Sequence, residues 1–106
     1  MGITKSQLFT PAQNRVAALA KAIGHPARIA ILEYLLGHKG CVCGEIVDAL
    51  PLSQSTISQH LKALKEAGLI KGQIEGVRTC YCIEEEVWKE AKVLIQTLFV
   101  DLKNCC

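Results

Sequence analysis

Apolar residues recur every three or four positions along most of this chain, the spacing typical of helices that bury one face. In the stretch 11–23, for example, Val16, Leu19 and Ile23 lie on one side of a helix, and Pro11 is typical of a first helical turn. The same spacing predicts five helices in all, over about residues 11–23, 26–37, 44–50, 53–67 and 84–103.

Alternating apolar and polar residues replace this spacing in the second half of the chain. They predict strands over residues 69–74 and 77–83, and the Glu-Gly pair between them indicates a hairpin turn. Alternation also places Cys80 and Cys82 on the same face of the second strand. A Cys-Val-Cys segment at 41–43 is expected to be extended as well.

The length of 106 residues predicts a single domain over 1–106, mainly α-helical with a small β-hairpin. We expect residues 1–9 to form a flexible arm and residues 104–106 a tail that contains cysteines. Half of the residues are hydrophobic, but so small a domain buries a limited core, and a partner subunit would enlarge it.

The sequence has neither an apolar stretch of ~20 residues nor a secretory signal. We therefore expect a cytoplasmic protein without a membrane partner.

The order short helix, tight turn, longer helix and hairpin predicts a winged helix-turn-helix, a DNA-binding module. In the longer helix, Ile57, Leu61 and Leu64 form an apolar back that can hold it against the domain. An ordinary amphipathic helix with a solvated polar face is the alternative for this segment taken alone. The full order of elements favours the DNA-binding interpretation.

The front of the longer helix carries short polar and basic side chains that suit DNA. Glutamine can bind adenine edges, serine and threonine can contact bases or phosphates, and basic groups bind phosphates. An arginine in the hairpin can enter a minor groove. The net charge of +2 is small, although residues 84–106 are acidic and the rest is mildly basic. The candidate DNA-binding residues are Ser53, Gln54, Ser55, Thr56, Ser58, Gln59, His60, Lys62, Lys65 and Arg78.

Three segments carry a resemblance to a known family. They read LAKAIGHPARIAILEYLL, CVCGEIVDALPLSQSTISQHLKALKEAGLI and EGVRTCYCI, and they resemble ArsR-type repressors of the ArsR/SmtB family in order and spacing. The resemblance covers roughly residues 16–83. It implies a homodimer that binds a palindromic operator and leaves it when an inducer binds.

The apolar stripes on residues 11–23 and 87–102 are candidates for a homodimer interface. The last helix carries more apolar surface than so small a fold needs, through Val87, Leu94 and Leu98 among others. Pairing across a twofold axis would place two recognition helices in successive major grooves, ~34–36 Å apart. The alternative is a terminal helix that packs only within its own domain.

Cys41 and Cys43 match a Cys-x-Cys that serves as an inducer site in the family that the chain resembles. Residues two apart on a regular helix point in different directions, so chelation requires an extended or distorted segment here. Such a distortion would move the neighbouring DNA-reading helices. The alternative is that both cysteines are small, half-buried hydrophobic residues. We favour the ligand interpretation.

A third thiolate could come from either of two places. Cys105 and Cys106 end the chain, and they could complete the site within one subunit or across the dimer. Cys80 and Cys82 could do so if residues 40–43 pair with their strand, in which case four thiols meet. For Cys80 and Cys82 we prefer simple strand packing.

The donor set restricts the inducer to soft ions, because pure thiolate sites favour them. Three thiolates suit As(III) or Sb(III), and four suit Cd(II), Pb(II) or Zn(II). The three histidines lie outside the last helix, so that helix lacks the His/Asp set of zinc-responsive members of the family. As(III) is therefore the expected inducer.

Two other functions compete with metal-controlled repression. The same thiols could form a disulfide or a persulfide in a redox-sensing repressor of this fold. A thiol enzyme using Cys41 or Cys80 is disfavoured, because no His/Asp or His/Asn arrangement flanks either residue and no Gly-rich phosphate loop is present. The sequence therefore predicts a transcriptional repressor and not an enzyme.

Overall fold

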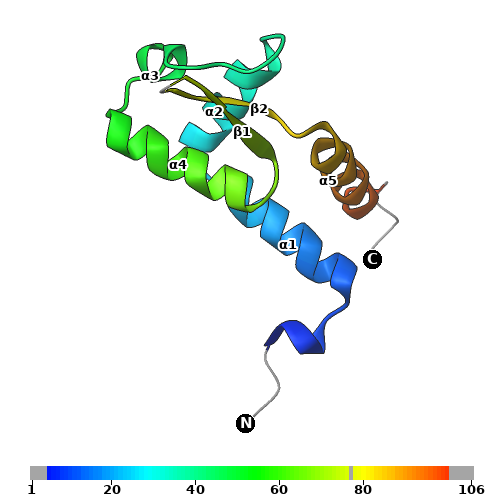
Figure 1. The fold of residues 1–106 in the computed structure, drawn as a ribbon. Helices are drawn as coiled ribbons and strands as arrows, with labels where there is room; N and C mark the ends of the chain where they lie inside the picture. The colour runs from blue at the N-terminus through cyan, green and yellow to red at the C-terminus, as the bar shows by residue number, and fades with distance from the viewer. Residues whose placement is uncertain (1–4, 77, 101–106) are drawn as a thin grey trace.

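The computed structural model describes residues 5–76 and 78–100, which form a mainly helical fold with one two-stranded hairpin (Figure 1). A short 3₁₀ turn, η1, lies within the segment predicted to be a flexible arm. The elements are η1 (Lys5–Leu8), α1 (Pro11–Ile23), α2 (Pro26–Leu36), α3 (Glu45–Ala49), α4 (Gln54–Glu66), β1 (Ile70–Glu75), β2 (Arg78–Ile83) and α5 (Glu85–Leu98). Their order confirms the predicted winged helix-turn-helix, and α1 to α4 and both strands agree with the predicted ranges to within one residue at each end.

Local signals explain where α1 and α4 begin and end. Thr10 and Gln13 form a reciprocal capping box at the start of α1, with Gln13 N donating to Thr10 Oγ1 at 3.0 Å. Gly68 follows α4 with a φ of +85°, a left-handed conformation that glycine adopts without strain. The predicted stop at Gly68 is therefore a backbone requirement.

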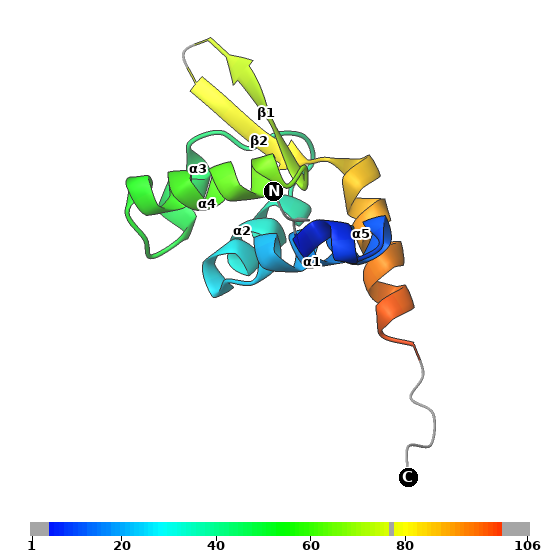
Figure 2. The same cartoon turned by 90° about the horizontal axis from the view of Figure 1, so that it is seen from below.

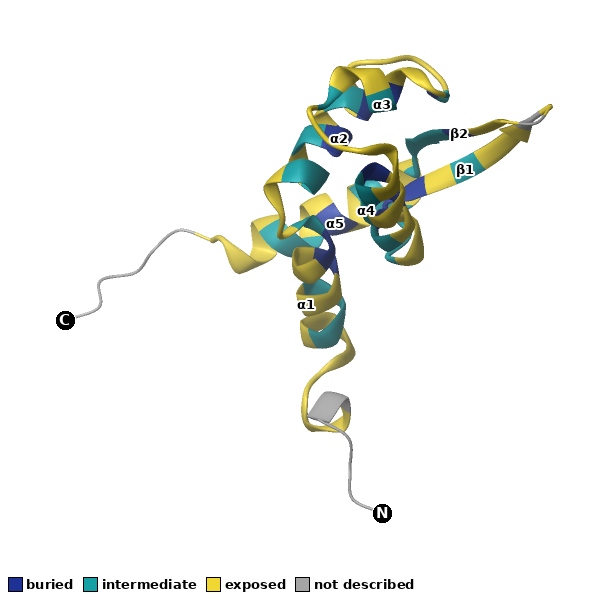
Figure 3. Cartoon of the chain, turned by 90° about the vertical axis from the view of Figure 1, so that its left-hand side faces the viewer, coloured by how far each residue is buried: buried dark blue, intermediate teal, exposed yellow. Residues whose placement is uncertain are grey.

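The core lies where α1, α2, α4 and the base of the hairpin meet (Figure 3). Leu19, Ile31, Ile57 and Leu64 are fully buried there. Each such side chain contributes roughly 1.5–3 kcal/mol by leaving water. The apolar back predicted for the longer helix is thus confirmed as core.

The hairpin extends away from the helices, as Figure 2 shows. β1 pairs with β2 in antiparallel register, from Ile70 opposite Ile83 to Glu75 opposite Arg78. Gly76 at the turn has a φ of +64°. Ile70 is buried at the base, whereas Ile74 near the tip is 81% exposed, so the wing is anchored at one end only.

Helix α5 is shorter than the predicted 84–103. It begins at Glu85 and ends at Leu98, and Phe99 leaves the helical conformation. Leu98, Phe99 and Val100 are all exposed, so no packing against the described residues 5–76 and 78–100 supports another turn. Arg15 of α1 holds α5 through an ion pair with Glu90 at 2.9 Å, and this hydrogen bond lowers the pKa of Glu90.

Some predicted features lie outside the described residues. These are the arm residues 1–4, the strand start at Val77, the helix end over 101–103, and the tail with Cys105 and Cys106. Among the helices that the structure describes, none is long and apolar enough to cross a membrane.

Candidate DNA-binding surface and cysteine cluster

Helix α4 has one buried face and one exposed polar face. Ile57, Leu61 and Leu64 point into the core with at most 4% exposure. The opposite face carries the polar and basic side chains predicted to meet DNA. The exposed members of that set on α4 are Gln54, Ser55, Ser58, Gln59, Lys62 and Lys65, whereas Thr56 and His60 are half-buried.

Ser53 has a structural role at the start of α4 as well as a place on the polar face. Its side chain accepts from Thr56 N at 3.3 Å, and its hydroxyl donates to Thr56 Oγ1 at 2.9 Å. The cap satisfies one of the free N–H groups of the first turn. Ser53 and Thr56 therefore fix the helix start, and the neighbouring Gln54 and Ser55 remain exposed.

The wing and α4 border a common groove. It is lined by Gln54 and Ser58 from α4 and by Arg78 and Thr79 from β2, among others. Arg78 is exposed at the outer end of β2. The fold thus brings the predicted wing arginine to the same side as the polar face of α4.

His60 belongs to a small cluster that the sequence analysis did not predict. Arg28 Nε donates to His60 Nδ1 at 3.1 Å, and Arg28 Nη1 donates to the Ala22 carbonyl at 3.1 Å. The His25 ring lies beside it, with ring centroids 4.5 Å apart. Desolvation, followed by the charges of His25 and Arg28, lowers the pKa of His60. His60 is therefore a neutral ring at pH 7, with its proton on Nε2.

A main-chain bridge joins the segment before α3 to the wing. Val42 N donates to Tyr81 O at 2.7 Å, and Tyr81 N donates to Val42 O at 2.8 Å. Val42 is 6% exposed and belongs to the core. The predicted extended conformation at 41–43 is therefore confirmed, and the segment is joined to β2 by a single antiparallel β-bridge.

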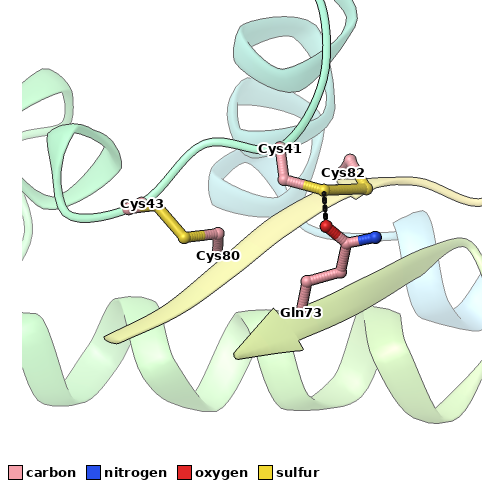
Figure 4. The surroundings of a disulfide bond; sticks show 5 residues. All are labelled: Cys41, Cys43, Gln73, Cys80 and Cys82. Atoms are coloured by element: carbon pink, nitrogen blue, oxygen red, sulfur yellow. Dashed lines mark hydrogen bonds between the residues drawn. A yellow bond between two sulfur atoms is a disulfide. The ribbon is translucent and has the colours of Figure 1, made fainter. Parts of the chain in front are cut away.

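The bridge brings four cysteines together in two disulfides. Cys41 is bonded to Cys82 and Cys43 to Cys80, with Cα–Cα distances of 4.4 and 4.0 Å. Figure 4 shows both bonds between the loop before α3 and strand β2. In the sequence these partners are 41 and 37 residues apart, so the spacing of the cysteines alone did not reveal the pairing.

Gln73 is a further residue of this site that the sequence analysis did not single out. It lies opposite Cys80 in the β1–β2 register, and its Oε1 is 3.3 Å from Cys41 Sγ (Figure 4). This oxygen can accept a hydrogen bond from the Cys41 thiol when the cysteine is reduced. In the oxidised form, residues 5–76 and 78–100 contain no group of three or more His, Cys, Asp or Glu side chains able to hold a metal ion.

The outer faces of α1 and α5 form a second, apolar surface. Ala12, Val16 and Ala17 of α1 line a shallow groove with Leu94 and Leu98 of α5. Leu98 is 62% exposed and Val93 is 61% exposed. Ala91 is buried and Val87 and Leu94 pack against the core, so within the described part of a single chain only the end of the α5 stripe, at Leu98 and Phe99, is exposed.

A winged helix-turn-helix with an exposed polar recognition helix defines a DNA-binding transcriptional regulator. The chain belongs to the ArsR family: residues 25–71 match the family model described as bacterial regulatory protein, arsR family. The expected resemblance and fold class are confirmed. Proteins of this family are DNA-binding regulators and not enzymes.

Relatives along nearly the whole chain support this membership. An uncharacterized HTH-type transcriptional regulator of Methanocaldococcus jannaschii, MJ1325, is 42% identical over 87 residues, covering 80% of this chain and 96% of the relative. The regulator YgaV of Escherichia coli is 37% identical over 91 residues, covering 86% and 85%. A cadmium resistance regulatory protein CadC homolog of Staphylococcus aureus is 32% identical, covering 80% and 68%.

Solved structures of similar proteins have the same fold. One is the homodimeric winged helix-turn-helix domain of Mb0332 from Mycobacterium bovis, with a TM-score of 0.68, 30% identity and coverage of 92% of this chain and 87% of that chain. Another is a possible transcriptional regulator for arsenical resistance, with a TM-score of 0.68, 26% identity and coverage of 76% and 83%.

Proposed function

We propose that this protein is a cytoplasmic repressor that binds operator DNA as a homodimer and leaves it when cysteine thiolates bind a soft ion. The exposed polar face of α4, held from behind by Ile57, Leu61 and Leu64, carries the DNA-binding part of the proposal. Gln54 and Gln59 read base edges, Lys62 and Lys65 bind phosphates, and Arg78 reaches the adjacent minor groove. His60 donates from Nε2 to a phosphate as a neutral group.

The homodimer forms through α1 and α5 in this proposal. The apolar groove that α1 and α5 share, with Leu98 exposed at its edge, supports it, as does the homodimeric state of the similar Mb0332 domain. A twofold axis through these helices leaves both α4 helices free to enter successive major grooves.

Cys41 and Cys43 hold the inducer, for which As(III) is the first candidate, with Sb(III), Cd(II), Pb(II) and Zn(II) as further candidates. The extended segment at 41–43 supports this role, because it places two soft donors directly before α3. The names of the cadmium-resistance and arsenical-resistance relatives point to the same class of ions. Cys105 and Cys106 remain candidates for a third thiolate, and they lie outside the described residues.

A second candidate function is thiol-based redox sensing, and the two disulfides favour it. Oxidation of four thiols to two disulfides releases four protons and passes four electrons to an oxidant such as a peroxide or a low-molecular-weight disulfide. The two bonds then tie the segment before α3 to the wing. A persulfide at one cysteine is a related route to the same disulfide.

Cys41→Ser and Cys43→Ser test the inducer site directly. We expect each variant to keep operator affinity within about twofold but to lose release by As(III), because serine lacks a soft thiolate. The measurement is release of labelled operator from the reduced dimer during titration with arsenite, Cd(II), Zn(II) and, separately, an oxidant.

The titration also separates the two candidates. Release by ions under reducing conditions supports metal control, and release only by oxidant supports redox control. A Cys41→Ser/Cys43→Ser double variant that still responds normally to arsenite would show that the proposed inducer site is wrong.

A further inference from the structure

The four paired cysteines are held together by the backbone as well as by their sulfur bonds. Both hydrogen bonds of the Val42–Tyr81 bridge are main-chain bonds, at 2.7 and 2.8 Å, and Val42 is buried in the core. None of these contacts involves sulfur. Reduction of the disulfides therefore leaves the four thiols next to one another.

All four sulfurs lie on one side of the Val42–Tyr81 bridge. Cys41 and Cys43 flank Val42, and Cys80 and Cys82 flank Tyr81, so strand alternation turns both pairs to the side opposite the bridge residues. Cα atoms across the bridge are 4.0 and 4.4 Å apart, and those within each pair are ~6.6 Å apart along the strand. Short, rotatable cysteine side chains at these spacings can converge on one ion.

The surroundings favour thiolates and exclude much of the solvent. Cys80 is fully buried, and the other three cysteines are half-buried. Lys71 lies opposite Cys82 in the sheet register, and Lys71 and Lys89 line the pocket beside Cys41 and Cys82, together with Glu85. Nearby lysines stabilise thiolates over thiols.

We propose that Cys41, Cys43, Cys80 and Cys82 of one subunit form a four-thiolate site for a soft divalent cation, with Cd(II) as the probe. This deepens the proposed function and rests on it only for the link to DNA release. A dithiol reductant supplies four electrons and four protons to open both disulfides. Each of the four thiols then loses a proton to solvent as its sulfur binds the ion, which gives a tetrahedral all-sulfur site. The tail cysteines are not ligands in this site.

The site spans the two elements that meet DNA. Cys43 is two residues before α3, and Cys80 is two residues after Arg78, the first residue of β2. An ion held by all four sulfurs fixes the start of α3 relative to the wing. Release of DNA then follows if the fixed arrangement differs from the one bound to the operator.

The first test is a cysteine footprint on the wild-type protein. The reduced dimer is incubated with and without Cd(II) and then alkylated, and each cysteine is quantified by mass spectrometry. We expect Cd(II) to slow alkylation of Cys41, Cys43, Cys80 and Cys82 at least tenfold and to leave Cys105 and Cys106 unchanged. Protection of the tail pair in place of Cys80 and Cys82 would overturn the proposal.

Matched variants give the second test. Cys80→Ser/Cys82→Ser and Cys105→Ser/Cys106→Ser each remove two thiols, and Cd(II) affinity and sulfur-to-cadmium charge-transfer absorption are measured for both. We expect the first variant to bind Cd(II) at least tenfold more weakly with a smaller absorption, and the second to match the wild type. Because Cys80 is buried, Cys80→Ser/Cys82→Ser is the variant at risk of not folding. In that case Cys82→Ser alone replaces it in the same measurements.

The outcomes separate this site from the proposed function. Tetrathiolate binding of Cd(II) without operator release would leave the site standing and refute the proposed control of DNA binding. Release by Cd(II) that persists in Cys80→Ser/Cys82→Ser would refute the four-thiolate site and leave the proposed function standing.

Discussion

His60 lies at the edge of α4, where its ring meets Arg28 and His25. The hydrogen bond from Arg28 uses Nδ1 as an acceptor, so the ring must be neutral with its proton on Nε2. His25 uses its own Nδ1 to accept from Ala27 N at 3.0 Å, which caps α2. The His25 side chain therefore caps α2, and Arg28 links α2 to the neutral His60 ring of the recognition helix.

The fold should lose stability in mild acid through His60. The pKa of His60 lies below its ordinary value of 6.5 in the folded chain, so the unfolded chain binds a proton more readily. The contribution of neutral His60 is therefore complete above about pH 6.5 and is lost as the pH falls through the lowered pKa. We expect the Tm of wild type to decline over this window more steeply than that of His60→Gln.

Nuclear magnetic resonance titration of the His60 ring checks the cause of that decline. A pKa at or above 6.5 in the folded protein would show that the Arg28–His60 contact does not form in solution. Equal pH dependence of Tm in wild type and His60→Gln would show that another group is responsible.

At the scale of elements, α4 combines a buried apolar face with an exposed polar face. Its buried stripe anchors it to α2 and β1, and its exposed side chains are short and polar. The wing is anchored at Ile70 and projects beside α4, so both elements can contact one stretch of DNA. The proposed DNA contacts and the packing of the core therefore use different faces of the same helix.

Gln54→Ala with Gln59→Ala should weaken operator binding without unfolding the protein. Both side chains are exposed, so we expect Tm to change by less than about two degrees, in line with surface substitutions. Each lost base contact costs ~1–3 kcal/mol, so operator affinity should fall at least tenfold. A filter-binding assay measures the loss, and Gln96→Ala on α5 is the control. Normal affinity of the double variant would show that another element reads the DNA.

At the scale of the whole molecule, the described residues of a single chain leave an apolar groove between α1 and α5 open to solvent. α1 and α5 contact each other through Arg15 and Glu90 and present a shared groove with exposed Leu98. Contiguous apolar surface of this kind marks an interaction site. A second copy covers it in the proposed homodimer, which also sets the distance between the two recognition helices.

Leu98→Glu should convert the dimer to a monomer. A carboxylate in an apolar interface has no partner there, and its desolvation is costly. We expect monomers in sedimentation velocity and an operator affinity at least tenfold weaker, because each subunit then binds one half-site alone. Gln96→Glu adds the same charge at another exposed position of α5 and should remain dimeric. A tight Leu98→Glu dimer would mean that the stripe packs within one subunit.

The sequence determined the elements of this fold because their signals are local. The apolar stripe of Ile57, Leu61 and Leu64, the Thr10–Pro11 helix start and the glycines after α4 and in the hairpin act over a few residues. The same local pattern defined the polar face of α4 and hence the DNA-binding class. The end of α5 was not predicted, because Phe99 and Val100 continue the apolar pattern but are exposed in the part of the chain that the structure describes.

Only the tertiary structure decided which distant residues meet. The pairing of Cys41 with Cys82 and of Cys43 with Cys80 depends on the Val42–Tyr81 bridge, which forms because Val42 is buried in a core built from several elements. The contact between Arg28 and His60 likewise requires α2 to cross α4. Contacts between residues more than 30 positions apart follow from packing and loop closure, which local spacing does not encode.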